Sequence, residues 1–284
     1  MQRFSEKVVF VTGAGKGQGR SHALRFAEEG ADIIATDLAT PYPERVRYQA
    51  ATLDDLQETR ELVQKAGRKC VAVQADVRDR SALQAAVNRG VEELGRLDIV
   101  VANAGVITFH ESSLDISDDV YDLIIDTNLR GVWNTIQVTA PLLKRNPHGG
   151  SIVITSSAAG LRGQTHYAHY AAAKTGVVGL MRAFSNELAE YRIRVNTVHP
   201  TGVASPGMGS STDTPELFAQ SRTFPLNAMN MLPDLDSAPG TEYSPVPVLR
   251  VSEISGTVLF LASDEARYIT GVSLPVDAGN TSKP

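Results

Sequence analysis

Short apolar runs alternate along the chain with longer stretches in which apolar residues recur every three or four positions. The short runs are rich in Val, Ile and Ala, as strands buried on both faces of a parallel sheet require. The predicted strands are Val8–Val11, Asp32–Thr36, Cys70–Gln74, Ile99–Ala102, Ser151–Thr155, Arg194–Val198 and Val272–Pro275. The predicted helices are Gln18–Glu29, Leu53–Ala66, Arg80–Leu94, Asp118–Lys144, Ala168–Glu190 and Glu253–Ser263. This order predicts one α/β domain over residues 1–284, a Rossmann-type doubly wound parallel sheet of about seven strands with helices on both faces.

Two segments interrupt the alternation. Leu38–Ala51 is a long, proline-containing stretch, and Thr201–Arg250 is richer still in Pro, Met, Ser and Thr. Long irregular segments in a compact domain are functional loops or surface excursions without a function. We predict a cofactor-side insertion at 38–51 and a substrate lid at 201–250, since the second follows a strand's carboxyl end, where open sheets bind ligands. The apolar lid residues suit a hydrophobic substrate: Met208, Leu217, Phe218, Phe224, Met229, Met231 and Leu232.

Composition narrows the class of protein. The 284 residues are 42% hydrophobic, and the formal net charge of -5 with a pI near 5.7 argues against a nucleic-acid or anionic-membrane partner. Cys70 is the single cysteine, so no disulfide within the chain is possible. We find neither a signal-peptide pattern nor an apolar stretch of membrane-spanning length, and we expect a cytoplasmic protein.

A glycine-rich run follows the first predicted strand and opens the first predicted helix. Glycines there permit a tight turn and let backbone amides approach a pyrophosphate, which the helix N-terminus also attracts. A plain turn is the alternative, but the strand–glycine–helix context favours nucleotide binding. The candidate cofactor residues in this run are Gly13, Gly15, Lys16, Gly17, Gln18 and Gly19.

The choice between NAD and NADP depends on two opposed charges. Asp37 ends the second predicted strand, where a carboxylate accepts hydrogen bonds from a ribose 2′-hydroxyl and repels a 2′-phosphate. Lys16 acts in the opposite direction, since a cation in the glycine run could accept that phosphate. We give Asp37 more weight and predict NAD. Further candidate contacts with the cofactor are Leu38, Asp76, Val77, Asn103, Ala104 and Gly105.

Tyr170 and Lys174 lie four residues apart in a predicted helix, so they share one face. An ammonium ~4 Å from a phenol, at an effective dielectric of ~20, favours the phenolate by roughly 4 kcal/mol. That is about three pKa units, enough to make the tyrosine an acid/base near working pH. The alternative interpretation is an amphipathic helix with a snorkelling lysine.

Two further polar side chains fit this chemistry. Ser157 ends the fifth predicted strand and could hold a substrate oxygen beside the phenol, whereas Ser156 has a less suitable spacing. Asn128 lies in a long helix whose periodicity points it inward, where a satisfied buried amide is the alternative. Tyr167 lacks a lysine four residues later, so we do not select it.

Together these residues resemble the short-chain dehydrogenase/reductase family over nearly the whole chain. The motifs that carry the resemblance are Thr12–Gly19, Asp76, Asn103-Ala104-Gly105, Asn128, Ser157, the pair Tyr170 and Lys174, and Val276-Asp277-Ala278-Gly279. The resemblance implies that Tyr170 is the acid/base and that Ser157 orients the substrate. It also implies that Lys174 lowers the tyrosine pKa and binds the nicotinamide ribose. Asn128 would support a proton relay through water.

The resemblance extends to one branch of the family. Gly17–His22, Asn196–Val203, Ala262–Tyr268 and the long loop after Asp37 are similar to the mycofactocin-coupled branch, which includes carveol dehydrogenase-type enzymes. In that branch the extra loop is thought to retain NAD, so that the peptide-derived carrier mycofactocin regenerates the cofactor in place. The implied cofactor contacts after the sixth strand are Pro200, Thr201, Gly202, Val203 and Ser205. Of these, Thr201 replaces the family's commoner glycine, and Ser205 a frequent threonine.

The leading functional hypothesis is reversible oxidation of a hydrophobic, terpenoid or alicyclic secondary alcohol to its ketone with NAD. One rival is an NADP-linked carbonyl reductase with an exchangeable cofactor, and another is a non-enzymatic, nucleotide-responsive binding protein. A serine hydrolase is disfavoured because no Gly-x-Ser-x-Gly elbow is present. We expect no metal site, since His166 and His169 lack acidic or cysteine partners. Long helices with apolar residues on several faces suggest an intersubunit face, and the resemblance implies a homotetramer.

Overall fold

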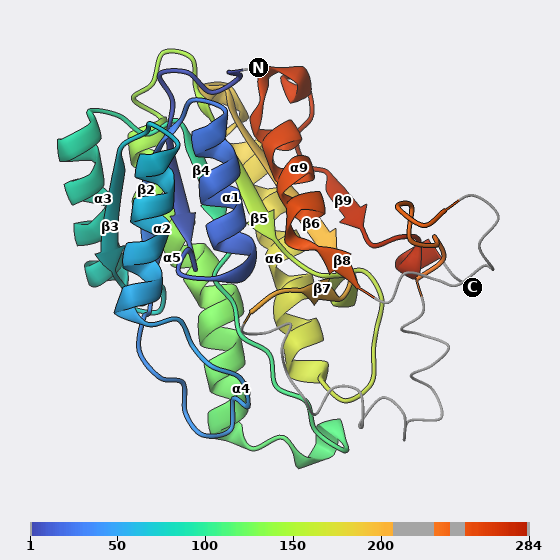
Figure 1. Ribbon diagram of the computed structural model, residues 1–284. Coiled ribbons are helices and arrows are strands. Elements are labelled where there is room, and N and C mark those ends of the chain that lie inside the picture. The colour runs from blue at the N-terminus through green and yellow to red at the C-terminus, as the bar shows by residue number, and fades with distance from the viewer. Residues whose placement is uncertain (1, 207–229, 239–247, 283–284) are drawn as a thin grey trace.

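The computed structural model describes residues 2–206, 230–238 and 248–282, and it confirms the predicted fold class. Seven parallel strands form the central sheet in the spatial order β3-β2-β1-β4-β5-β6-β9 (Figure 1). The strands are β1 (Val8–Thr12), β2 (Asp32–Asp37), β3 (Cys70–Gln74), β4 (Ile99–Ala102), β5 (Gly150–Thr155), β6 (Ile193–Pro200) and β9 (Ser273–Val276). The order reverses between β1 and β4, the switch point where open α/β sheets bind ligands.

Helices cover both faces of the sheet. On one face lie α1 (Gly17–Glu28), α2 (Leu53–Lys65) and α9 (Val251–Ala262), which share an apolar cluster with β1 and β2. On the other face lie α3 (Arg80–Leu94), α5 (Gly131–Leu143) and α6 (Ala168–Glu187). Both clusters contain side chains from the same strands, because the strands are buried on both faces. Most observed boundaries lie within one or two residues of the predicted ones; α6 ends at Glu187 rather than Glu190, and a 3₁₀ turn follows at Ala189–Tyr191.

The predicted helix Asp118–Lys144 is not uniform. It begins as α4 (Asp118–Ile125), passes through a π-helical turn at Asp126–Arg130 and continues as α5. In that turn the Gly131 N–H donates to the carbonyl of Asp126, five residues earlier. Such π turns occur often at functional sites, and this one contains Asn128.

The two irregular segments have different surroundings. The insertion 38–51 runs from the end of β2 to the start of α2, beside the carboxyl ends of the strands (Figure 1). Around the predicted lid, β7 (Val203–Ala204) pairs with β8 (Leu249–Arg250). Five of the apolar residues assigned to the lid lie outside the described residues: Met208, Leu217, Phe218, Phe224 and Met229. The other two, Met231 and Leu232, are exposed.

Candidate active site

A cavity of about 460 Å³ lies at the carboxyl ends of β1, β2, β3 and β4. It is lined by thirteen of the predicted cofactor residues: Gly13, Lys16, Gly17, Gln18, Gly19, Asp37, Leu38, Asp76, Val77, Asn103, Ala104, Gly105 and Ser205. We call this cavity the cofactor groove. The remaining candidates lie beside it or at its far end, as described below.

The glycine run needs its glycines for close packing. Gly13 has a φ of +67°, and a Cβ there would lie 2.9 Å from Ala104 Cα. A Cβ on Gly19 would lie 2.0 Å from the Gly13 carbonyl oxygen, so neither position accepts a larger residue. Gly15, which does not line the groove, packs against Ala51 and Asp37 instead. The run therefore brings the start of α1, with its free amides, against β4 and the groove.

Asp37 is held at the mouth of the groove by backbone amides. Its carboxylate accepts hydrogen bonds from Gly15 N at 2.8 Å and from Ala39 N at 3.1 Å. Burial raises the pKa of Asp37, and these amide bonds oppose that rise because they stabilise the charged form. The carboxylate therefore faces the groove in a fixed orientation.

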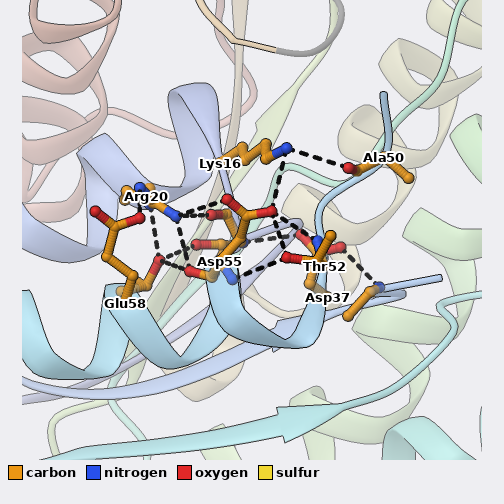
Figure 2. A network of polar contacts seen from close by, with 11 residues as sticks. Lys16, Arg20, Asp37, Ala50, Thr52, Asp55 and Glu58 are labelled. Atoms are coloured by element: carbon orange, nitrogen blue, oxygen red, sulfur yellow. Dashed lines mark hydrogen bonds and ion pairs between the residues drawn. The ribbon is translucent and has the colours of Figure 1, made fainter. Parts of the chain in front are cut away.

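Lys16 is engaged with the insertion and with α2. Its ammonium donates to the carbonyl of Ala50 at 3.2 Å and forms an ion pair with Asp55 at 3.1 Å. Figure 2 shows this ammonium within the network that also contains Arg20 and Thr52. Since Lys16 already has an anionic partner, the structure weakens the argument that it awaits a 2′-phosphate.

The insertion crosses the groove and is anchored on both sides. Near its end Ala50 accepts a hydrogen bond from Lys16, and at its middle Arg45 hydrogen-bonds to Ser117 and forms an ion pair with Asp119 at 3.1 Å. Between them the Tyr48 hydroxyl accepts a hydrogen bond from Ile107 N at 3.1 Å. Sequence reasoning found the insertion but not these contacts, for which the only signal was the presence of tyrosines in an irregular segment.

Two buried polar atoms of groove-lining residues have no protein partner among the described residues. They are Gln18 Oε1 and Thr127 Oγ1. Tyr48 also lines the groove, and its hydroxyl accepts the Ile107 amide. A buried polar atom is costly without a partner, so these atoms suit a ligand with hydroxyl groups, which can donate to Gln18 Oε1 and exchange a hydrogen bond with Thr127 Oγ1.

The two loops on either side of the groove centre are held differently. Asn103 is fixed to β1, because Thr12 Oγ1 accepts hydrogen bonds from the backbone amides of Asn103 and Ala104, each at 3.0 Å. Asp76 is not the cap of α3, a role taken by Asp79. It instead pairs with Arg78, with its Oδ2 2.6 Å from Nη2, and this pairing lowers the pKa of Asp76.

Tyr170 and Lys174 share a face of α6, as predicted, but their electrostatics differ from the prediction. The Lys174 ammonium donates to the carbonyl of Thr155 at 2.8 Å and lies 5.6 Å from the centroid of the Tyr170 ring. Burial raises the pKa of Tyr170 to about 12 and lowers the pKa of Lys174 to about 8. The predicted depression of the tyrosine pKa is thus wrong for this structure, because desolvation of the phenolate raises the pKa more than the hydrogen bond with Ser157 lowers it.

Ser157 lies beside the phenol. Its hydroxyl accepts Ala159 N at 3.2 Å, and its hydrogen bond with Tyr170 opposes the rise of the tyrosine pKa. The neighbouring Ser156 is directed elsewhere, with its hydroxyl donating to the carbonyl of Lys174 at 2.8 Å. Tyr167 is buried against the Tyr170 ring and has a raised pKa. The geometry therefore distinguishes Ser157, which bonds to the Tyr170 phenol, from Ser156, which bonds to the backbone of α6.

Asn128 is fully buried and braces the exit of β4. Its side-chain oxygen accepts Val106 N at 3.0 Å, and its amide donates to the carbonyls of Val106 and Ile124. A Cβ on Gly105 would lie 2.5 Å from the Asn128 oxygen, so the glycine permits this contact. The side chain is satisfied by backbone groups, as the alternative interpretation held.

The predicted cofactor residues from Pro200 to Ser205 have different surroundings. Pro200 continues β6 and pairs with Val276 of β9, and Val203 belongs to β7. Gly202 accepts Leu249 N, and the Thr201 hydroxyl contacts Asn230 at 3.1 Å. From this segment only Ser205 and Pro206 are among the groove-lining residues.

Two further classes of site were tested. The described part of the chain contains no group of three or more His, Cys, Asp or Glu side chains placed to hold a metal ion. Nor does any described helix have the length and apolarity needed to cross a bilayer.

Sequence comparison identifies the class to which this fold and site belong. The model of the short chain dehydrogenase family matches residues 7–216, and the chain belongs to that family. Its relatives include the (-)-trans-carveol dehydrogenase of Rhodococcus erythropolis, 45% identical over 284 residues and all of both chains. The crystal structure of carveol dehydrogenase from Mycobacterium avium in complex with NAD is 47% identical, with a TM-score of 0.90 over 100% of both chains. A short chain dehydrogenase from Mycobacterium paratuberculosis bound to NAD is 42% identical, with a TM-score of 0.91 over 99% of each chain.

Proposed function

We propose that the protein is an NAD-dependent dehydrogenase that interconverts a hydrophobic secondary alcohol and its ketone. The observation that carries the proposal is the closeness of a polar groove to the Ser157–Tyr170–Lys174 cluster. Gly105 lines the groove, and a Cβ on it would lie 3.4 Å from Lys174 Nζ. The similarity to carveol dehydrogenases supports an alicyclic alcohol as the substrate class.

The residues of the groove fit NAD. Asp37 would accept the hydroxyls of the adenine-side ribose, and the amides at the start of α1 would bind the pyrophosphate. The unpartnered oxygens of Gln18 and Thr127 add hydrogen-bonding capacity along the groove. Because Lys16 is paired with Asp55, we favour NAD over the rival NADP-linked reductase with an exchangeable cofactor.

The chemistry of the chain's own residues is a proton transfer. Bound NAD supplies a carbon that accepts or returns the hydride. Ser157 would hold the substrate oxygen while Tyr170 takes the alcohol proton, or donates a proton to the ketone. Lys174 would bring its positive charge and bind the nicotinamide ribose, and Asn128 would keep the exit of β4 in place for a proton relay through water.

The insertion supports a finer proposal about the cofactor. Its contacts at Ala50 and Arg45 and the Tyr48 bond to Ile107 would have to break before a dinucleotide could leave the groove. We therefore propose that NAD stays bound between turnovers and passes its electrons to a carrier, for which mycofactocin is the candidate. A homotetramer and a cytoplasmic location remain part of the proposal. The non-enzymatic alternative loses support because Tyr170, Lys174 and Ser157 are all present.

The decisive experiment denatures the purified protein and identifies any nucleotide released, then assays trans-carveol oxidation with and without an artificial electron acceptor. We expect NAD in about equal amount to the protein and sustained turnover only with the acceptor. Exchange with free NAD would remove the retention proposal alone, whereas rapid turnover with free NADP would overturn the cofactor preference. Absence of nucleotide binding together with absence of turnover would favour a different function.

A further inference from the structure

The chain that leaves β5 is held by hydrogen bonds at each residue from Thr155 to Ser157. Thr155 O accepts the Lys174 ammonium, and Ser156 N donates to the carbonyl of Val198 at 2.9 Å. The carbonyl of Ser157 accepts two donors: Gly160 N at 2.9 Å from the following turn, and His199 Nδ1 at 2.8 Å from the end of β6. The second donor comes from a residue that the proposed chemistry does not use.

The partners of His199 determine which of its nitrogens carries the proton. A carbonyl oxygen can only accept, so Nδ1 must be the protonated nitrogen that donates to Ser157. Nε2 lies 2.8 Å from the Thr197 hydroxyl, a shorter contact than that hydroxyl makes with the Val272 carbonyl or the Ser273 hydroxyl. In a neutral imidazole Nε2 accepts, so the Thr197 hydroxyl donates to it.

The surroundings of His199 disfavour its charged form. The side chain is fully buried, and burial lowers its pKa, with the nearby Lys174 charge acting in the same direction. The bond to Ser157 and the charge of Asp277 oppose this shift. A protonated His199 would place a second positive charge near Lys174. It would also put an N–H on Nε2, which could then no longer accept a hydrogen bond from the Thr197 hydroxyl. One tautomer is therefore selected, and it always presents its N–H to Ser157.

We propose that His199 is a positioning residue of the reaction: its Nδ1–H fixes the peptide of Ser157 and thereby holds the Ser157 hydroxyl beside the Tyr170 phenol. Two donors that approach one carbonyl from different elements fix the orientation of the peptide plane, which the turn bond from Gly160 alone does not. The inference rests on the proposed function, since it assigns His199 a role through Ser157 and Tyr170.

The test compares His199→Leu with His199→Asn. Leucine removes the N–H donor. The amide nitrogen of asparagine is bonded to Cγ, as Nδ1 of histidine is, so it can still donate to the Ser157 carbonyl. We measure kcat and KM for trans-carveol on the NAD-loaded enzyme with a saturating artificial electron acceptor, together with the nucleotide content and the melting temperature. We expect His199→Leu to lower kcat roughly 10- to 100-fold with NAD binding retained, as a displaced reacting group does. His199→Asn should remain within about threefold of the parent.

A pH profile separates positioning from a merely structural role. The Ser157 hydrogen bond opposes the burial that raises the Tyr170 pKa, and the other titratable groups around that phenol are Lys174, Tyr167 and Tyr48. In His199→Leu the acid limb of kcat for alcohol oxidation should move to higher pH, and in His199→Asn it should not. If the leucine variant does not fold, Thr197→Val, which removes the partner of Nε2, should show the same shift with a smaller loss of kcat.

His22→Leu is the matched control. His22 is equally buried and is also bonded through Nδ1 at 2.8 Å, but to Ser255 between α1 and α9. It should lower the melting temperature without altering the pH profile. An unchanged kcat and acid limb in the folded His199→Leu or Thr197→Val enzyme would overturn the positioning role. Full activity of Tyr170→Phe in the same assay would instead overturn the proposed function, so the two failures are distinguishable.

Discussion

The cofactor groove and the reacting end, formed by Ser157, Tyr170 and Lys174, differ in their polar contacts: the first relies on a partly exposed ion pair and the second on a buried hydrogen bond. At the groove, Lys16 and Asp55 form an ion pair in which the two side chains keep 21% and 20% of their exposure. At the reacting end Tyr170 and Lys174 are almost fully buried, and the ammonium bonds to the Thr155 carbonyl instead of a carboxylate. Ion pairs in contact with water contribute about 0–1 kcal/mol each, whereas an orphaned buried polar group costs about 1–3 kcal/mol. The groove should therefore tolerate single substitutions that the reacting end does not.

The largest contrast is expected at Tyr170. Tyr170→Phe removes the group that exchanges a proton with the substrate, and positioned acid/base groups contribute roughly 100- to 10,000-fold in rate. We expect a loss of kcat in that range with nucleotide content unchanged. The matched control is Tyr167→Phe, which removes the hydroxyl of the neighbouring buried ring. Near-parental kcat in Tyr170→Phe would eliminate this residue as the acid/base.

An intermediate effect is expected at Asp37. Two negative charges ~4 Å apart repel by about 4 kcal/mol at an effective dielectric of ~20, and part of that is screened at the groove mouth. Asp37→Ser should raise the affinity for NADP relative to NAD by roughly ten- to a hundredfold, measured by calorimetric titration of protein freed of nucleotide.

Lys16→Met provides the comparison for Asp37. Because Lys16 is paired with Asp55, its loss should change the NAD-to-NADP ratio by less than about threefold. A collapse of NADP binding in this variant would show that the lysine, and not the carboxylate, controls the choice of cofactor.

The smallest effect concerns His22, a buried histidine outside the groove. It tests whether burial alone shifts a side-chain pKa. Burial lowers the pKa of His22 to about 3 from 6.5. The unfolded chain therefore takes up a proton below pH 6.5 while the folded chain does not, so stability is lost as the pH falls. At pH 5.5 this costs about 1.4 kcal/mol relative to pH 8.

Removing the imidazole should remove that cost. His22→Gln should flatten the acid side of the unfolding free energy, measured by urea titration between pH 8 and pH 5.5. Equal slopes in the parent and in His22→Gln would mean that His22 is protonated in the folded state.

The fold could be predicted because apolar runs of strand length and helical periodicity are local properties of the sequence. Thirteen of the groove residues could also be predicted, because they belong to short motifs that are recognisable in the sequence, such as the glycine run after the first strand. The π turn at Asp126–Arg130 was not predicted, because a shift of one residue in hydrogen-bond register barely changes the apolar pattern.

Two other properties of the site were not accessible from the sequence. The contacts of Arg45 and Tyr48 join segments far apart in the chain, and an irregular insertion has no period from which to infer them. The pKa of Tyr170 moved in the direction opposite to the prediction, because the spacing to Lys174 reveals the neighbouring charge but not the depth of burial. The branch-specific retention of NAD stays a prediction.

The π turn has a consequence for how the site could be lost. A turn closed between Asp126 and Gly131 holds one residue more than an α-helical turn, so the chain there carries a surplus residue. Deleting a single codon within 126–130 would let α4 and α5 merge into one regular helix with no change to the sheet. The amide of Asn128 would then turn away from Val106, and a fully folded chain could lose its chemistry in one genetic step.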